Sequence, residues 1–231
     1  MTLHVFVGSL TRYYAGDWEG SAPEDRPDPA ALHRAVLAWR DGLSEALAKT
    51  LPSALDWDER ADAPFRSERP GWAGYHGLVL WAAHDDYPKP MKPERPLEDL
   101  TADKAFLACQ KPGVTTRYPH LVRKTALFLP CDFPFTFKAP DVAGDDVAIG
   151  SSVALLRELE TLNQRTFRAD DTAMTGWLAA GATPESHLKD AARFGLAFFL
   201  KLARLSVSQR LPVKVDADPE PLRAKTVHQR F

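Results

Sequence analysis

The feature that most constrains the fold is a long apolar helix predicted for residues 183–205. Thr183-Pro184-Glu185 has the composition of a helix start, with an N-capping threonine, a proline at the first helical position and an acidic residue in the first turn. Apolar residues then cover two adjoining faces of this helix: Leu188, Ala192, Phe194, Gly195, Phe198, Phe199, Leu202 and Leu205. Because a helix that is apolar over so wide an arc needs neighbours on most sides, we expect it to be central and buried.

A second amphipathic helix is predicted to begin at Asp28-Pro29, which supplies an N-cap and a proline at the first helical position. Its apolar stripe has helical spacing and consists of Leu32, Val36, Trp39, Leu43 and Leu47. Since both helices need an apolar partner, we expect them to share one core. The residues predicted to be buried together are Trp39, Phe198, Phe199 and Leu202.

Residues 126–138 change from a helical period to a period of two. Apolar side chains occupy every odd position from Leu127 to Phe137, which indicates a half-buried strand. Pro130 and Pro134 cannot donate to a hydrogen-bond ladder, so this strand should lie at a sheet edge or be bulged or broken. The other predicted elements are strands at residues 3–7, 147–149 and 211–215, and helices at residues 71–86, at residues 97–109 and after Ser152.

These elements predict an α+β fold, a helix-dominated single domain with a small mixed β-sheet and a long buried C-terminal helix. Residues 1–216 are expected to form one globular domain, and the polar residues 217–231 are expected to form a flexible tail. No stretch approaches the ~18 uncharged apolar residues of a membrane span, and the N-terminus lacks the features of a secretion signal. The sequence therefore predicts a cytoplasmic protein that does not bind a membrane; the strand order and the oligomeric state are left open.

The overall charge and the missing motifs exclude several function classes. The formal net charge is −2, which argues against a protein that binds nucleic acid mainly through phosphate contacts. Cys109 and Cys131 have no second Cys or His at metal-ligand spacing, so both are expected to be free thiols. The sequence contains no GxSxG, HExxH or CxxC motif. No metal and no cofactor is predicted.

Residues 10–28 and 51–70 are expected to be long connections, and each carries a candidate partner-binding segment. The first combines hydroxyl, aromatic, arginine and acidic side chains, which is typical of interface anchors, and the second places acidic residues around one tryptophan. The predicted partner-binding residues are Thr11, Arg12, Tyr13, Tyr14, Asp17, Trp18, Glu19, Trp57 and Asp58. In the alternative interpretation, the aromatic residues pack down to pin the loops, and Arg12 pairs with Asp17.

Two further motifs have both a functional and a structural interpretation. His84, Asp85 and Asp86 end a predicted helix and could supply the acid and base of a small hydrolase. Adjacent helical residues point in different directions, however, so a solvated helix end is the alternative. Gly150-Ser151-Ser152 could hold an anion at a helix N-terminus or could simply cap the helix.

The segments that carry a resemblance to known proteins are Gly8-Ser9-Leu10-Thr11-Arg12-Tyr13-Tyr14, Asp17-Trp18-Glu19, and Gly150-Ser151-Ser152 with Leu155-Leu156. In these segments, in size and in its lack of a leader, the chain resembles uncharacterised proteobacterial proteins, some of which look like immunity proteins of toxin systems. The resemblance implies a cytoplasmic protein-binding protein, an immunity factor that neutralises a bacterial toxin, and it favours binding over catalysis. A small hydrolase that uses a His/Asp site and a small-ligand sensor are the alternatives.

Overall fold

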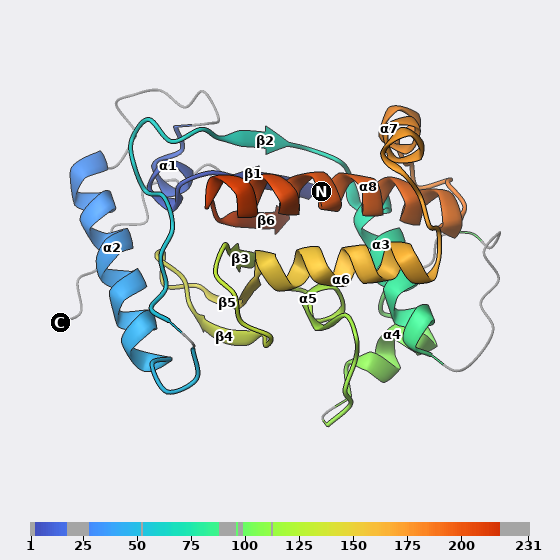
Figure 1. Cartoon of the computed structure of the whole chain (residues 1–231), viewed down its shortest axis with the longest axis horizontal. Coiled ribbons are helices and arrows are strands. Elements are labelled where there is room, and N and C mark those ends of the chain that lie inside the picture. Colours follow the sequence, from blue (N-terminus) through green and yellow to red (C-terminus); the bar gives the residue numbers. More distant parts are fainter. Residues whose placement is uncertain are drawn as a thin grey trace.

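The computed structural model describes residues 3–17, 28–51, 53–87, 96, 99–111 and 113–217. These residues form eight helices and one mixed six-stranded sheet, which confirms the predicted α+β class with its long C-terminal helix (Figure 1). The helices are α1 (Leu10–Ala15), α2 (Pro29–Ala46), α3 (Trp72–Asp86), α4 (Lys104–Cys109), α5 (Pro119–Val122), α6 (Ser152–Arg165), α7 (Asp171–Ala180) and α8 (Leu188–Gln209). The strands are β1 (Leu3–Val7), β2 (Arg66–Glu68), β3 (Leu127–Leu129), β4 (Phe137–Pro140), β5 (Asp146–Ser151) and β6 (Val213–Ala217). Of the predicted tail, residues 218–231 lie outside the described residues.

The sheet has the strand order β2-β1-β6-β3-β5-β4 and is covered on both faces. Strands β3 and β5 run parallel, and the other neighbouring strands are antiparallel. Successive side chains of a strand point to opposite faces. In β3, Phe128 therefore joins a core with the long helices, whereas Leu127 and Leu129 join a second core under α1 and α2. The sheet separates these two apolar clusters.

Helix α8 is the buried centre of the larger core, as its apolar pattern predicts. It lies beside α6 across one face of the sheet (Figure 1) and packs most extensively against α3. Glycine makes the contact between α3 and α8 unusually close. A Cβ atom on Gly195 would lie 2.1 Å from the carbonyl oxygen of Gly74, and one on Gly77 would lie 2.6 Å from the Cβ of Ala191. The two helices therefore touch through their backbones.

The prediction that Trp39 is buried together with residues of the C-terminal helix is wrong. Phe198, Phe199 and Leu202 are buried together in the larger core, but Trp39 is half-buried in the second core on the other side of the sheet. Its indole N–H donates to the carbonyl oxygen of Pro140 at 2.8 Å, and its ring meets that of Trp57 edge-on. Helical spacing identifies the apolar face of α2 but does not tell which layer that face contacts.

Short elements were the main errors of the sequence prediction. The expected connection 10–28 begins with helix α1, and the expected connection 51–70 contains the edge strand β2. Helices α5 and α7 were not predicted. The predicted strand 126–138 is broken into β3 and β4, in agreement with its prolines. Elements α1, α5 and β2 have three to six residues and are too short to show a clear period, so tertiary contacts decide them. Helix α7 has ten residues, but Met174 is its one buried residue, so it has no apolar stripe that would mark it.

Two helices begin later than their sequence signals indicate. Helix α8 starts at Leu188, because Thr183 and Ser186 instead form a turn in which each backbone N–H bonds to the other residue. Helix α4 starts at Lys104, where the carboxylate of Asp103 accepts from two backbone N–H groups. Of the predicted start of that helix, residues 97 and 98 lie outside the described residues.

Among the described residues, no helix combines the length and the apolarity that a membrane crossing requires.

The close contact between α3 and α8 gives a stability prediction. Gly195→Ala should lower the free energy of unfolding by about 1–3 kcal/mol, because the new methyl group collides with the backbone of α3. Gly176→Ala in α7 is the matched control, since a Cβ at Gly176 meets nothing within 4 Å. It should raise stability by up to ~1 kcal/mol through helix propensity. Chemical denaturation measures the free energy of unfolding of both variants. Equal changes in the two variants would contradict the backbone contact between α3 and α8.

Candidate functional site

A buried carboxylate, that of Glu59, joins α1 to the segment 55–63. Its Oε1 accepts from the backbone N–H of Leu10 at 2.8 Å and from the indole N–H of Trp57 at 2.6 Å. Its Oε2 accepts from the backbone N–H of Thr11 at 2.9 Å and from the hydroxyl of that residue at 2.8 Å. Glu59 is only 5% exposed. A buried carboxylate is stable only when it is well paired. Three of these bonds fix the segment against α1, and the bond from Trp57 orients the carboxylate within the segment.

Helix α1 is defined by local capping signals at both ends. The hydroxyl of Ser9 accepts from the backbone N–H of Arg12, and Gly16 adopts the left-handed conformation that closes the helix. The side chains of Thr11 and Arg12 point toward a cleft, whereas Tyr14 is buried on the inner side. The short helix therefore has one side that faces the cleft and one side that packs against the core.

The inner side of α1 rests on a buried polar network. The hydroxyl of Tyr14 donates to Asp141 at 2.7 Å, and the Nζ atom of Lys214 lies 3.0 Å from the same carboxylate. The hydroxyl of Tyr13 donates to Asp216. Burial, reinforced by the charge of Asp141, raises the pKa of Tyr14 far above its ordinary value, so its hydroxyl stays protonated and remains a donor. The network anchors α1 to β6 and to the turn before β5.

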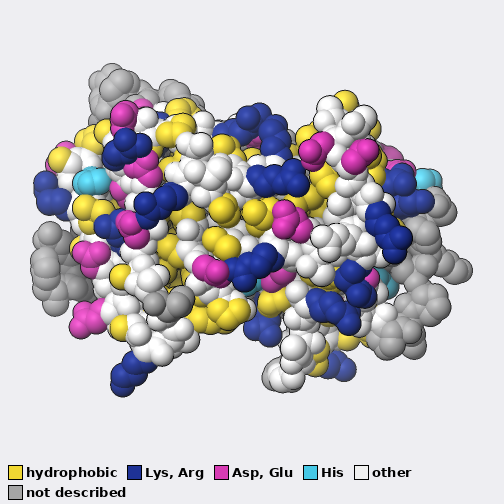
Figure 2. All heavy atoms as spheres, in the orientation of Figure 1, with side chains coloured by type: hydrophobic (Ala, Val, Ile, Leu, Met, Phe, Trp, Pro, Cys, Tyr) yellow, Lys and Arg dark blue, Asp and Glu magenta, His cyan; other side chains and the backbone are white. Residues whose placement is uncertain are grey.

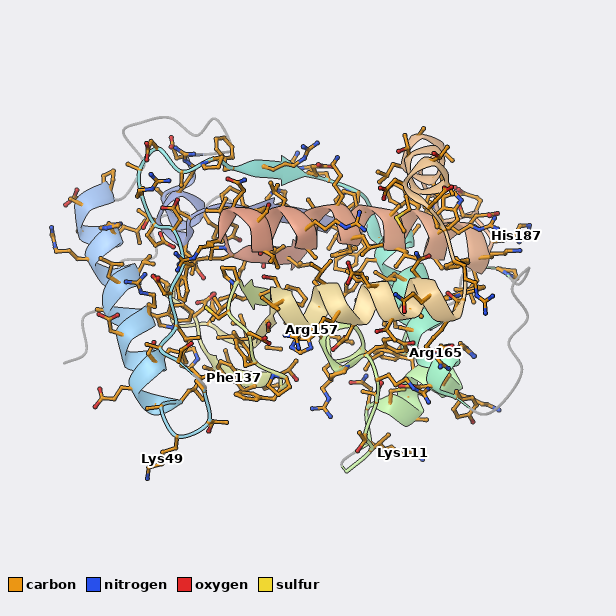
Figure 3. The ribbon with its side chains drawn as sticks, in the orientation of Figure 1. Lys49, Lys111, Phe137, Arg157, Arg165 and His187 are labelled. Atoms are coloured by element: carbon orange, nitrogen blue, oxygen red, sulfur yellow. The ribbon has the colours of Figure 1, made fainter. Side chains whose placement is uncertain are left out.

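An open cleft of about 1000 Å³ lies between α1, α2, the segment 57–61 and the C-terminal end of α8. Figure 3 shows α8 running from His187 at one end of the molecule to its C-terminal end beside α1 and α2. The cleft thus combines residues that lie far apart in the sequence. Figure 2 shows basic and acidic side chains intermingled over the end of the molecule that carries α2.

Arg12 is fixed in the cleft wall by four interactions. Its Nη1 and Nη2 atoms each donate to a backbone carbonyl at 2.8 Å, those of Ala63 and Ala61. Its Nε atom lies 3.3 Å from the carboxylate of Asp17, and its guanidinium lies 4.6 Å from the ring centre of Phe65. The predicted pairing of Arg12 with Asp17 is therefore present. Arg12 holds the loop after Glu59 against α1.

Three further guanidinium groups line the cleft. Arg40 and Arg210 share one carboxylate, that of Asp56, with a distance of 3.3 Å from the Nη1 atom of Arg40. Arg60 binds the carboxylate of Asp58 through its Nε and Nη2 atoms at 2.8–3.1 Å. Hydrogen bonds from Arg60 hold the pKa of Asp58 below its usual range. These pairs keep the arginines ordered at the rim.

One histidine adds a titratable group to the cleft. The Nδ1 atom of His33 lies 3.3 Å from the hydroxyl of Thr11. Because that hydroxyl donates its proton to Glu59, it can only accept from His33. The chain His33–Thr11–Glu59 crosses the floor of the cleft from α2 to the segment 55–63.

The structure brings the two predicted partner-binding segments together. Thr11, Arg12 and Asp17 line the same cleft as Trp57 and Asp58, although 40 positions separate Asp17 from Trp57. The other predicted residues have different places.

Tyr14 and Trp57 are not available as large contact surfaces. Tyr14 is buried under α1, and Trp57 is 3% exposed. Tyr13 is half-buried and bonds to Asp216. These three side chains support the cleft from below, in line with the alternative interpretation of their segments. Trp18 and Glu19 lie outside the described residues.

Four residues that line the cleft are not among the predicted ones: His33, Arg40, Arg60 and Arg210. A signal existed for two of them, since His33, Leu37 and Arg40 recur at helical spacing and therefore share one face of α2. No local pattern marks Arg210, because it reaches the cleft only through the path of α8.

His84, Asp85 and Asp86 do not converge on one point. His84 lies 3.0 Å from the Asp103 carboxylate that caps α4. Asp85 accepts from the hydroxyl of Tyr118 and from Arg165, which is labelled on α6 in Figure 3.

Asp86 accepts from the hydroxyl of Thr116 and from the backbone and side chain of Arg117, at 2.6–2.7 Å. It lines a separate hollow of about 760 Å³ together with Cys109, and burial raises the pKa of that thiol. The three residues His84, Asp85 and Asp86 therefore tie the end of α3 to three different segments, and they do not form an acid–base pair with one another.

The motif Gly150-Ser151-Ser152 is used for capping and packing. The hydroxyl of Ser151 accepts from the backbone N–H of Ala154 and caps α6. The hydroxyl of Ser152 is buried and accepts from Ser206 in α8 at 2.7 Å. Both hydroxyls thus have protein partners at the positions where an anion would bind.

Within the described residues, no group of three or more His, Cys, Asp or Glu side chains is arranged to hold a metal ion. No protein-family model, curated protein or solved structure matches the chain. Its function is therefore argued from the cleft itself.

The role of Glu59 gives a second prediction. Glu59→Gln should lower the free energy of unfolding by about 2–3 kcal/mol, because the amide nitrogen that replaces one oxygen cannot accept from its buried donors. Glu68→Gln at the edge of the sheet is the control. Its pairs with Arg66 and with Lys201, at 3.6 Å, are partly exposed, and the change should cost less than about 1 kcal/mol. Urea denaturation measures the free energy of unfolding of both variants. If Glu59→Gln were as stable as Glu68→Gln, the role of Glu59 would be contradicted.

Proposed function

We propose that the chain is a cytoplasmic protein-binding protein, an immunity factor that neutralises a bacterial toxin, and that the cleft between α1, α2 and the end of α8 receives the partner. One observation carries this proposal. Residues from both predicted segments, Thr11, Arg12 and Asp17 from the first and Trp57 and Asp58 from the second, line a single cleft. The resemblance to immunity proteins supports the identity of the partner as a toxin.

The hydrogen bonds and ion pairs of the arginines that line the cleft support a binding function. Each lining arginine has an acidic or backbone partner, and Glu59 fixes the loop that carries Arg60. Side chains that are already ordered lose little conformational entropy when a partner binds. Arginine is also enriched at protein interfaces, where its guanidinium group can stack and donate several hydrogen bonds.

A steric block tests the proposed site without changing its charge. Ala30 is exposed in the first turn of α2 and lines the cleft. Ala30→Trp should place a bulky indole in the cleft and weaken the complex with the partner at least ~30-fold, the effect of losing one strong anchor. The melting temperature should change little, because an exposed residue contributes little to stability.

The partner is sought by co-expressing the chain with the products of neighbouring genes, and the affinity of the purified complex is then measured by calorimetry. Ala35→Trp is the matched control, since Ala35 is an exposed alanine of α2 outside the cleft. It should bind like the unmodified chain. A complex that tolerates Ala30→Trp, or that is lost equally in both variants, would refute the cleft as the partner site.

A further inference from the structure

Arg210 has a backbone conformation that arginine does not favour. It follows the last turn of α8 with φ 54° and ψ 47°, the left-handed region. Glycine is the usual residue at this position of a helix end, because a Cβ atom clashes there with the following backbone. Both backbone groups of Arg210 are hydrogen-bonded. Its N–H donates to the carbonyl of Ser206, and its carbonyl accepts from the backbone N–H of Asp58 at 2.9 Å. A glycine could make the same two bonds.

The side chain of Arg210 contributes little to the stability of the fold. It is 60% exposed, and its partner Asp56 is 62% exposed. Ion pairs between exposed groups stabilise a protein weakly. Asp56 moreover has a second guanidinium beside it, that of Arg40, whose Nε atom also lies 3.7 Å from Asp41. Local stability therefore does not explain why arginine occupies this strained position.

The position of the charges in the cleft suggests an explanation. The side chains of Arg60 and Arg210 are 70% and 60% exposed. Two carboxylates that line the cleft, those of Asp58 and Glu59, are recessed, whereas Asp17 is 45% exposed and pairs with Arg12. A molecule that enters on the side of Arg60 and Arg210 therefore meets their guanidinium groups before the recessed carboxylates. Guanidinium groups bind carboxylates through paired, charge-assisted hydrogen bonds.

We infer that the cleft recognises an acidic segment of its protein partner, and that Arg210 is a specificity-determining residue for it. This inference rests on the proposed function of the cleft and adds the chemistry of its occupant. A carboxylate of the partner competes with Asp56 for Arg210, while Asp56 keeps Arg40 as its second partner. Arg60 contributes the second guanidinium group at the rim.

Arg210→Gly tests the inference, with Arg168→Gly as its matched control. Arg168 is also an exposed arginine in the left-handed region, with φ 52°, but it follows α6 and lies outside the cleft. Both glycine variants should keep or raise the melting temperature of the chain, because both relieve the same strain. The probes are fluorescein-labelled hexaglutamate, hexalysine and a short single-stranded DNA, and binding is measured by fluorescence anisotropy at low and at high salt.

The unmodified chain and Arg168→Gly should bind hexaglutamate in preference to the other two probes, and high salt should weaken this binding. Arg210→Gly should bind hexaglutamate at least ~10-fold more weakly, as expected for the loss of a charge-assisted contact. The inference is overturned if hexaglutamate does not bind, if DNA binds in its place, or if Arg210→Gly binds like Arg168→Gly. It is also overturned if Arg210→Gly alone lowers the melting temperature. The Ala30→Trp experiment decides the proposed function separately, because that change leaves the charge of the cleft intact.

Discussion

The cleft depends on the burial of one carboxylate, that of Glu59. A carboxylate removed from water must find several donors, and Glu59 finds them in α1 and in Trp57. The three bonds to α1 place the loop 57–61 opposite that helix and so create the space between them. Arg12 then donates to the backbone carbonyls of Ala61 and Ala63 and so fixes the end of the loop and the residues after it against α1. Most of the interactions that build the two walls of the cleft are thus themselves buried or half-buried.

The remaining walls follow from the packing of the long helices. The glycine contact between α3 and α8 sets the position of α8 against the sheet, and the length of α8 carries Arg210 from the larger core to the cleft. Helix α2 reaches the same place through the second core, where Trp39 and Trp57 meet. The cleft therefore lies where the ends of two independently packed layers come together.

Periodicity predicted most of the long helices and several strands, but it missed α1, α5, α7 and β2. The strand at residues 3–7 and the helices α2, α3 and α6 follow from period and capping residues in the sequence alone. The composition of residues 11–17 and 57–58 pointed to the segments that form the cleft. Their convergence could not be predicted, since it depends on Glu59 and on strand order. The buried state of Tyr14 and the arrival of Arg210 also depend on contacts between distant segments.

The most direct test of the account is amide hydrogen exchange of the chain, measured alone and in complex with its partner. The account predicts that binding slows exchange in the segments that form the cleft, residues 9–17, 57–61 and the end of α8 around residue 209. Exchange in α7 and in the hollow around Asp86 should stay unchanged. Protection concentrated around Asp86 or on α7, with no change in the cleft, would contradict it.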